Sequence, residues 1–163
     1  SSVTGVQTCA LPIFTTEVVK DSLPRAMDMH IDLGFEGPET EQAMVLGNPT
    51  LLKEMVRNLI DNALNYTPSN AAHPGVVTAR VTGDAQHGWR LEVEDSGPGI
   101  PASERERVFE PFYRALGNEA DGSGLGLPIV LEIAQKHHAK VTLSDTAPGQ
   151  QPPGAKFMVQ FSV

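Results

Sequence analysis

The chain has 163 residues, 40% of them hydrophobic, which suffices for one domain with a buried core but not comfortably for two. Twelve basic and twenty acidic residues give a formal net charge of -8, which opposes binding to nucleic-acid backbones or anionic lipid surfaces. The single cysteine, Cys9, cannot form an internal disulfide, and no Cys/His cluster has the spacing of a zinc site. We therefore expect one domain in a reducing, cytoplasmic setting, with neither nucleic acid nor the membrane as a direct partner.

Residues 1–14 carry no recognisable role. No apolar run in the chain reaches the roughly 20 residues that cross a bilayer, and this first stretch lacks the basic start of a secretory signal. It also shows neither helical nor alternating periodicity. We expect it to be a linker or a segment foreign to the domain, which then covers residues 15–163.

The first elements after that segment are predicted from hydrophobic spacing. Residues 15–29 have helical spacing, although Pro24 argues against one unbroken helix. Alternation at Ile31, Leu33 and Phe35 predicts a strand that ends at Gly37-Pro38, with a short partner strand over residues 43–46.

A long amphipathic helix should follow. Asn48 can cap its free N–H groups, Pro49 suits its first turn, and Pro68 prevents it from continuing beyond about Tyr66. Apolar residues from Leu52 to Ala63 form one stripe of this helix, and polar residues occupy the other side.

The remaining elements complete a sandwich. Residues 76–82 and 89–94 read as an antiparallel hairpin, residues 125–137 as a helix, and residues 141–143 and 156–163 as closing strands. This order predicts an α/β (α+β) two-layer sandwich, in which a mixed, largely antiparallel sheet carries about three helices on one face.

Three of the sequence motifs have the chemistry of a nucleotide site, and each also has an ordinary structural explanation. In NLIDNALNYT, Asn58, Asn62 and Tyr66 share one helix edge, where uncharged amides can ligate a hard cation; the alternative is a solvated polar face. In DSGPGI, Asp95 can accept from the exocyclic amine of adenine; the alternative is an ordinary Asp-Ser-Gly turn. GSGLGL opens a helix whose free N–H groups can bind phosphate; the alternative is a packing or capping role.

The fourth motif, FEPFYR, lies between DSGPGI and GSGLGL. It is a hydrophobic anchor before a polar, glycine-containing stretch that could form a mobile lid, with Arg114 as its fixed positive charge. Five histidines are present, but none has a neighbouring acid–base constellation, so a structural role is favoured for each.

Together the four motifs resemble the ATP-binding catalytic domain of bacterial two-component sensor histidine kinases, in the GHKL superfamily shared with gyrase and heat-shock chaperone ATPases. The resemblance covers residues 15–163. It implies Asn62 as the Mg²⁺ ligand, Asn58 and Arg114 beside the phosphates, and Asp95 as the residue that reads adenine. The full set of ATP-binding residues that it implies is Asn58, Asn62, Asn65, Tyr66, Asp95, Gly97, Gly99, Ile100, Phe109, Arg114, Gly122, Ser123, Gly124, Leu125, Gly126 and Leu127.

One distinguishing residue, two departures from the family pattern and one absence refine this expectation. The gyrase-like relatives have a Glu that activates the attacking group where this chain has Asn58, which favours a kinase over a hydrolase. The family usually has Lys or Arg at Asn65, so one phosphate-facing charge is missing. Pro128 stands where a small helix former is usual, but it lies in a first turn, which tolerates proline. The phosphoacceptor histidine motif on a dimerisation helix is not found in the sequence.

The predicted function is therefore presentation of the γ-phosphoryl of Mg²⁺·ATP to a histidine on a separate dimerisation domain, for onward transfer to a response regulator. No residue in the chain is assigned as catalytic with certainty, because the acceptor histidine is absent. Two alternatives stay open: a stand-alone GHKL-type ATPase, and a degenerate, non-catalytic nucleotide-binding module. The intact protein could be anchored in the bacterial inner membrane.

Overall fold

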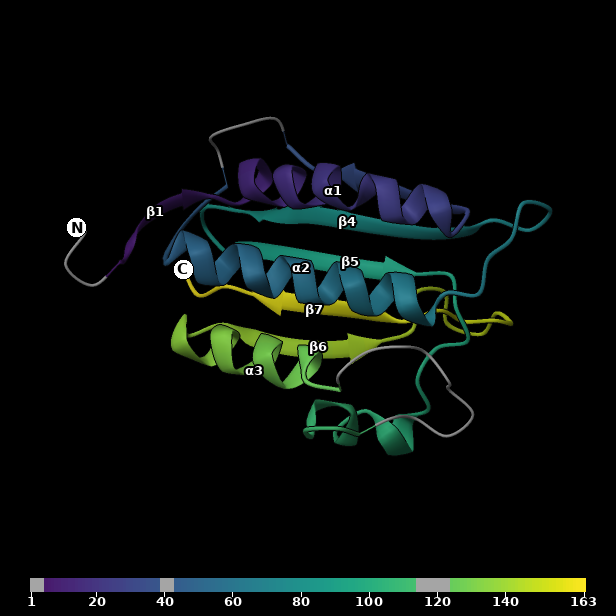
Figure 1. Cartoon of the computed structure of the whole chain (residues 1–163). Coiled ribbons are helices and arrows are strands. Elements are labelled where there is room, and N and C mark those ends of the chain that lie inside the picture. The colour runs from purple at the N-terminus through teal and green to yellow at the C-terminus, as the bar shows by residue number, and fades with distance from the viewer. Residues whose placement is uncertain (1–4, 39–42, 114–123) are drawn as a thin grey trace.

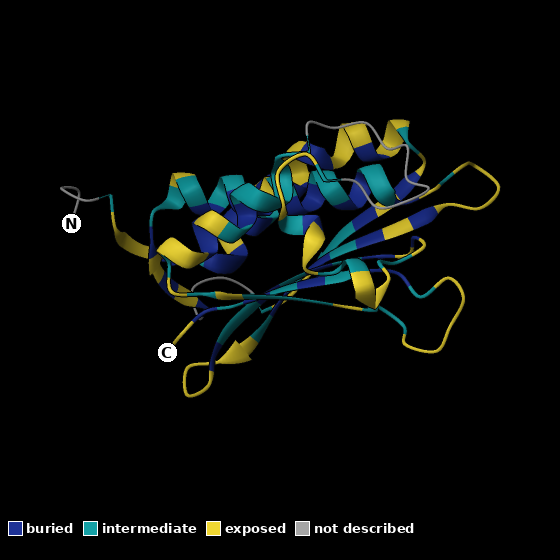
Figure 2. Ribbon diagram, turned by 90° about the horizontal axis from the view of Figure 1, so that it is seen from below, coloured by how far each residue is buried: buried dark blue, intermediate teal, exposed yellow. Residues whose placement is uncertain are grey.

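A five-stranded sheet with three α-helices on one face forms two layers (Figures 1 and 2). The structure, a computed structural model, describes residues 5–38, 43–113 and 124–163. Its helices and strands are β1 (Gln7–Ala10), α1 (Leu11–Asp28), β2 (Ile31–Glu36), β3 (Met44–Gly47), α2 (Pro49–Tyr66), β4 (Gly75–Asp84), β5 (Gly88–Asp95), α3 (Gly126–Lys136), β6 (Lys140–Ser144) and β7 (Lys156–Gln160). Two 3₁₀ turns, Ala102–Glu104 and Arg107–Phe109, lie between β5 and α3.

The strand order of the main sheet is β2-β4-β5-β7-β6. Only the β2–β4 pair is parallel, and the other three neighbouring pairs are antiparallel. The predicted hairpin is confirmed as β4 and β5, whose register places Asp95 opposite Val77. The two-layer sandwich with a mixed, largely antiparallel sheet is therefore confirmed, and Asp95 lies at the last position of a central strand.

Helix α2 lies in the middle of the helical layer, with its apolar stripe against the sheet (Figure 1). Asn48 caps it as predicted, because its side chain accepts a hydrogen bond from the N–H of Leu51 at 3.2 Å. Its buried side chains are Leu52, Met55, Val56, Leu59, Ile60, Ala63 and Leu64. Burial of each large side chain contributes roughly 1.5–3 kcal/mol, so this stripe fixes the rotation of α2 about its axis and turns its polar edge towards one end of the sheet.

No helix among the described residues has the length and apolarity that a membrane crossing requires.

The N-terminal part differs from the expectation. Residues 7–10 form β1, and α1 begins at Leu11 rather than at residue 15, so part of the expected linker packs on the domain. Leu11 and Phe14 are buried, which explains why the helix extends backwards. Helix α1 also continues through Pro24, contrary to the predicted break, because its buried apolar residues offset the cost of one lost helical hydrogen bond.

The strand at residues 44–47 is present, but its predicted partner is wrong. β3 pairs antiparallel with β1 in a separate two-stranded sheet, whereas β2 pairs with β4. The pairing depends on long-range contacts that the local alternation of β2 does not encode.

Candidate nucleotide site

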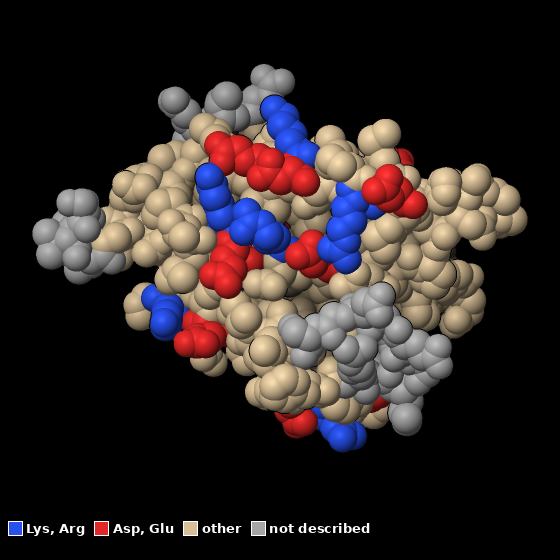
Figure 3. Space-filling model, viewed as in Figure 1, with Lys and Arg blue, Asp and Glu red and all other residues tan. Residues whose placement is uncertain are grey.

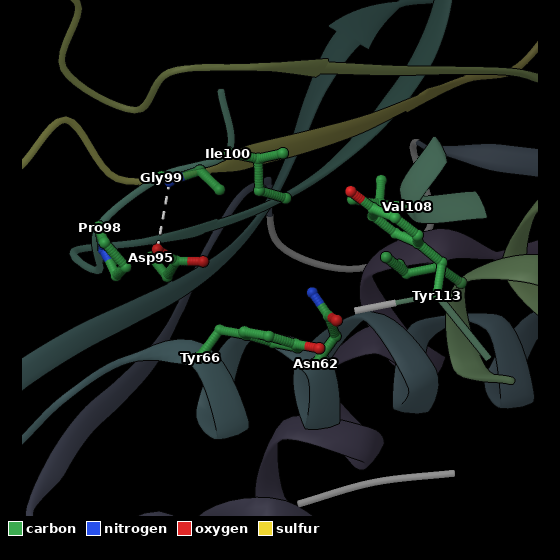
Figure 4. Close-up of a pocket in the computed structure, with 10 residues that line it drawn as sticks. Asn62, Tyr66, Asp95, Pro98, Gly99, Ile100, Val108 and Tyr113 are labelled. Atoms are coloured by element: carbon green, nitrogen blue, oxygen red, sulfur yellow. Dashed lines mark hydrogen bonds between the residues drawn. The ribbon is translucent and has the colours of Figure 1, made fainter. Parts of the chain in front are cut away.

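One pocket lies where the last turns of α2, the end of β5 and the start of α3 meet (Figure 4). Its lining residues are Asn62, Tyr66, Asp95, Pro98, Gly99, Ile100, Val108, Tyr113, Leu127 and Ala155. Residues from NLIDNALNYT, DSGPGI, FEPFYR and GSGLGL all contribute to this lining, so the four motifs converge in space as predicted.

The polar edge of α2 supplies the floor of the pocket. Asn62 and Tyr66 are four residues apart and therefore leave the helix on the same side. In Figure 4 both side chains border the same space as Asp95, which comes from the end of β5. An amide and a carboxylate from separate elements thus share one cavity.

Asn58, one turn earlier on the same edge, lies beside the pocket rather than in its lining. Its Nδ2 donates to the backbone carbonyl of Glu54 at 3.0 Å. A Cβ on Gly126 would lie 3.4 Å from the Asn58 Oδ1, so the first turn of α3 packs directly against this amide. Asn58 is therefore positioned at the N-terminus of α3, where free N–H groups favour an anion.

Asn65 is turned away from the pocket. Its Oδ1 accepts a hydrogen bond from Arg25 of α1, and the same guanidinium pairs with Asp61 at 2.8 Å. The outer face of the helical layer carries interleaved acidic and basic side chains, and a second pair, Glu17–Lys53, also joins α1 to α2 (Figure 3). The structure thus does not bring Asn65 to the other predicted site residues.

Asp95 is the buried charge of the site, with 4% of its surface exposed. The N–H groups of Gly97 and Ala155 donate to its Oδ1 at 2.8 and 3.2 Å. No other described residue hydrogen-bonds to this carboxylate, so its Oδ2 is left for a ligand. Burial raises the pKa of Asp95 to about 6, against the opposing effect of the two N–H donors.

The turn after Asp95 requires its glycines. A Cβ on Gly97 would lie 2.6 Å from the Tyr66 carbonyl oxygen, so no side chain fits between the turn and α2. Gly99 has a φ of +79° and lies against Gly154, where a Cβ would be 2.9 Å from the carbonyl oxygen. Gly97 therefore shapes the site from behind, whereas Gly99 and Ile100 line the pocket itself.

The FEPFYR motif contributes an anchor and a wall. Phe109 packs edge-on against Phe157 with ring centroids 6.1 Å apart, which ties the segment to β7. Tyr113 lines the pocket, and its hydroxyl donates to the carboxylate of Glu104. The guanidinium of Arg107 lies 4.8 Å from the centroid of the Tyr113 ring. The predicted Phe109 thus supports the site from the core, and Tyr113 faces the cavity.

The glycine-rich motif ends at the first turn of α3. Gly124 accepts a hydrogen bond from the N–H of Phe112 at 2.8 Å, which joins this motif to FEPFYR. Leu125 is at the N-cap position, and Leu127 lines the pocket. The remaining predicted residues, Arg114, Gly122 and Ser123, lie outside the described residues.

Four pocket-lining residues were not predicted: Pro98, Val108, Tyr113 and Ala155. Pro98, Val108 and Tyr113 lie within or next to the motifs, so their proximity in sequence was the available signal. Ala155 follows a Pro/Gly-rich loop 60 residues after Asp95, and nothing in its local pattern indicates that its N–H reaches that carboxylate.

Comparisons with known proteins identify the family of the chain. Residues 47–163 match the family model described as histidine kinase-, DNA gyrase B- and HSP90-like ATPase. The signal transduction histidine-protein kinase/phosphatase MprB of Mycobacterium avium (strain 104) is 40% identical over 149 residues, which are 91% of this chain and 28% of that protein. The MprB of Mycobacterium tuberculosis (strain ATCC 25618 / H37Rv) is also 40% identical, over the same share of this chain and 29% of its own length. The chain therefore spans less than a third of these curated relatives.

Solved structures give the same family. A mycobacterial sensor histidine kinase MprB superposes with a TM-score of 0.78 at 32% identity, covering 96% of this chain and 97% of that one. The nucleotide-free catalytic domain of histidine kinase ThkA superposes with a TM-score of 0.77 at 25% identity, covering 96% of both chains. This chain belongs to the family of histidine kinase-, DNA gyrase B- and HSP90-like ATPases and is an ATP-binding catalytic domain of the sensor histidine kinase type.

Proposed function

We propose that the pocket binds Mg²⁺·ATP with adenine at Asp95 and the metal-bound phosphates at Asn62, and that the domain presents the γ-phosphoryl to a histidine on a separate dimerisation domain. The phosphoryl group then passes to a response-regulator aspartate, in the cytoplasm. The observation that carries the proposal is that Asn62 and Asp95, from separate elements, line the same pocket.

Adenine selection follows from the hydrogen bonds of Asp95. Oδ1 is held by two backbone donors, so Oδ2 is a fixed acceptor. The exocyclic amine of adenine can donate to it, whereas guanine presents a carbonyl oxygen at the same place. A buried carboxylate facing that oxygen would be left unpaired, which explains why a guanine nucleotide should bind more weakly.

The residues present can hold Mg²⁺ only when the nucleotide supplies further ligands. The described part of the chain holds no group of three or more His, Cys, Asp or Glu side chains that could bind a metal. Mg²⁺ commonly takes one or two protein ligands and completes its shell with phosphate oxygens and water. Asn62 would be its protein ligand, and the ion, when bound, would neutralise phosphate charge.

At the phosphate end of the pocket, the role of the protein would be to orient the phosphates. The Leu125 side chain does not cap α3, and a helix N-terminus favours an anion through its N–H groups and dipole. Asn58 lies beside that terminus, and the resemblance adds Arg114 and Ser123 from outside the described residues. With these groups the domain supplies orientation and charge stabilisation rather than covalent chemistry.

Asn58, on the same edge of α2, favours phosphoryl transfer to a protein acceptor over hydrolysis of ATP. A carboxylate at position 58 could activate water, but Asn58 carries an amide whose nitrogen already donates to Glu54. Bound ATP should therefore persist until an acceptor histidine arrives.

The test combines binding with transfer. Calorimetry should show Mg²⁺-dependent ATP binding that Asn62→Ala weakens, and a cognate dimerisation domain supplied in trans should acquire acid-labile phosphate. Steady phosphate release from the isolated chain, abolished by Asn62→Ala, would instead identify a stand-alone ATPase. No binding at millimolar nucleotide would identify a non-catalytic module.

A further inference from the structure

The loop between β6 and β7 lies along the DSGPGI turn and is hydrogen-bonded to it at successive positions. The Asp95 N–H donates to the Ala155 carbonyl at 2.9 Å, and the Gly154 N–H donates to the Gly97 carbonyl at 3.0 Å. The Ala155 N–H reaches back to the Asp95 carboxylate. The segment that holds the adenine-reading carboxylate is therefore built from two distant parts of the sequence.

Thr146 joins these two parts through its side chain. Its hydroxyl lies 2.9 Å from the Asp95 carbonyl oxygen and 3.0 Å from the Ala155 carbonyl oxygen, so its one hydrogen is within donating distance of both. These are the backbone groups of the residue that would read adenine and of the residue whose N–H orients it. Thr146 is not among the residues that line the pocket, so its link to the site runs through Asp95 and Ala155.

A second link acts at the other end of the same turn. The guanidinium of Arg105 donates to the Ile100 carbonyl at 3.1 Å and to Asp145, the neighbour of Thr146, at 2.9 Å. Ile100 lines the pocket. The β6–β7 loop thus holds the turn at Asp95 and at Ile100, on both sides of its glycines.

We propose that Thr146 is a positioning residue for adenine recognition: its hydroxyl fixes the Asp95 backbone against Ala155 and so sets the direction of the carboxylate that selects adenine over guanine. This inference rests on the proposed function, because it assumes that Asp95 reads the base. It assigns nucleotide selectivity to a loop outside the four motifs.

The test compares three variants of the 163-residue chain. Thr146→Val keeps the shape and removes the hydroxyl, Thr146→Ser keeps the hydroxyl, and Thr142→Val changes a threonine on β6 that is not among the pocket-lining residues. Calorimetry measures the affinities for Mg²⁺·ATP, Mg²⁺·GTP and Mg²⁺·tripolyphosphate, which carries no base, and circular dichroism checks that each variant is folded.

Loss of one hydrogen bond from a buried backbone group should weaken ATP binding by Thr146→Val roughly tenfold and reduce the ATP preference over GTP. Tripolyphosphate affinity should not change, and Thr146→Ser and Thr142→Val should behave as the unsubstituted chain. If Thr146→Val is unfolded, Thr146→Ala is measured in its place with the same expectations.

Three results would overturn the inference: unchanged ATP and GTP affinities in the hydroxyl-free variant, an equal loss of ATP and tripolyphosphate binding, or a serine variant as weak as the valine variant. The proposed function fails separately if Asp95→Asn leaves the ATP and GTP affinities of the chain unchanged, and the inference then fails with it.

Discussion

Asp95→Asn should increase stability and weaken ATP binding at the same time. The buried carboxylate has its pKa raised to about 6 from 3.8, because burial disfavours the charged form. An acid whose pKa is raised by folding stabilises the native state below its unfolded pKa, and this contribution is lost as the pH rises through the folded value. At pH 8 the ionised Asp95 therefore costs up to about 3 kcal/mol, from roughly two pKa units at 1.36 kcal/mol each.

Asparagine removes that cost while its oxygen still accepts from the N–H groups of Gly97 and Ala155. Its amide nitrogen then takes the place of Oδ2 and presents a donor to the donor amine of adenine. Loss of a hydrogen bond to a charged acceptor costs about 1.5–3 kcal/mol, which corresponds to a roughly tenfold to hundredfold loss of ATP affinity.

Denaturant unfolding at pH 8 and at pH 4, together with calorimetry for ATP and GTP, measures both effects. The variant should be the more stable protein at pH 8, and its advantage should shrink towards pH 4. A variant that is less stable at pH 8, or that keeps the original preference for ATP, would contradict the role given to the buried Asp95 carboxylate.

Further predictions concern pH, metal and the outer face of α2. Adenosine affinity should fall as the pH drops below about 6, where Asp95 becomes protonated, and this pH dependence should be missing in Asp95→Asn; a flat profile in the unsubstituted chain would contradict the assignment. Mg²⁺ alone should not bind measurably in calorimetry, and Asn62→Ala should lose most of the Mg²⁺-dependent part of ATP affinity; tight metal binding without nucleotide would contradict a shared shell. Asn65→Ala should leave the ATP affinity within about twofold of the original value, because this side chain contacts Arg25 and exposed polar pairs of this kind contribute little free energy. A tenfold loss of ATP affinity would instead place Asn65 at the phosphates.

Much of the fold could be predicted because its patterns are local. The stripe of α2, the cap at Asn48 and the β4–β5 hairpin each follow from neighbours within a few residues, and the structure confirms them. Pro24 shows the limit of such reasoning, because the packing of α1 outweighed a local breaker. The partner of β3 was wrong for the same reason, since strand pairing depends on distant segments.

The same distinction between local patterns and long-range contacts applies to the residues of the site. Asn62, Tyr66 and Asp95 could be placed together because their motifs carry the chemistry of a nucleotide pocket, and all three line it. Asn65 shares a helix with Asn62, but the position of Arg25 decides which way it turns. Thr146 and Ala155 could not have been found, because their contacts with Asp95 join segments 51 and 60 residues apart.

An experimental structure of this chain with Mg²⁺ and a non-hydrolysable ATP analogue would show whether Asp95 and Asn62 hold the nucleotide. We expect the exocyclic amine of adenine within hydrogen-bond distance of the Asp95 carboxylate and the Asn62 side-chain oxygen coordinated to the metal. Adenine bound away from Asp95, or a metal without Asn62 among its ligands, would contradict it.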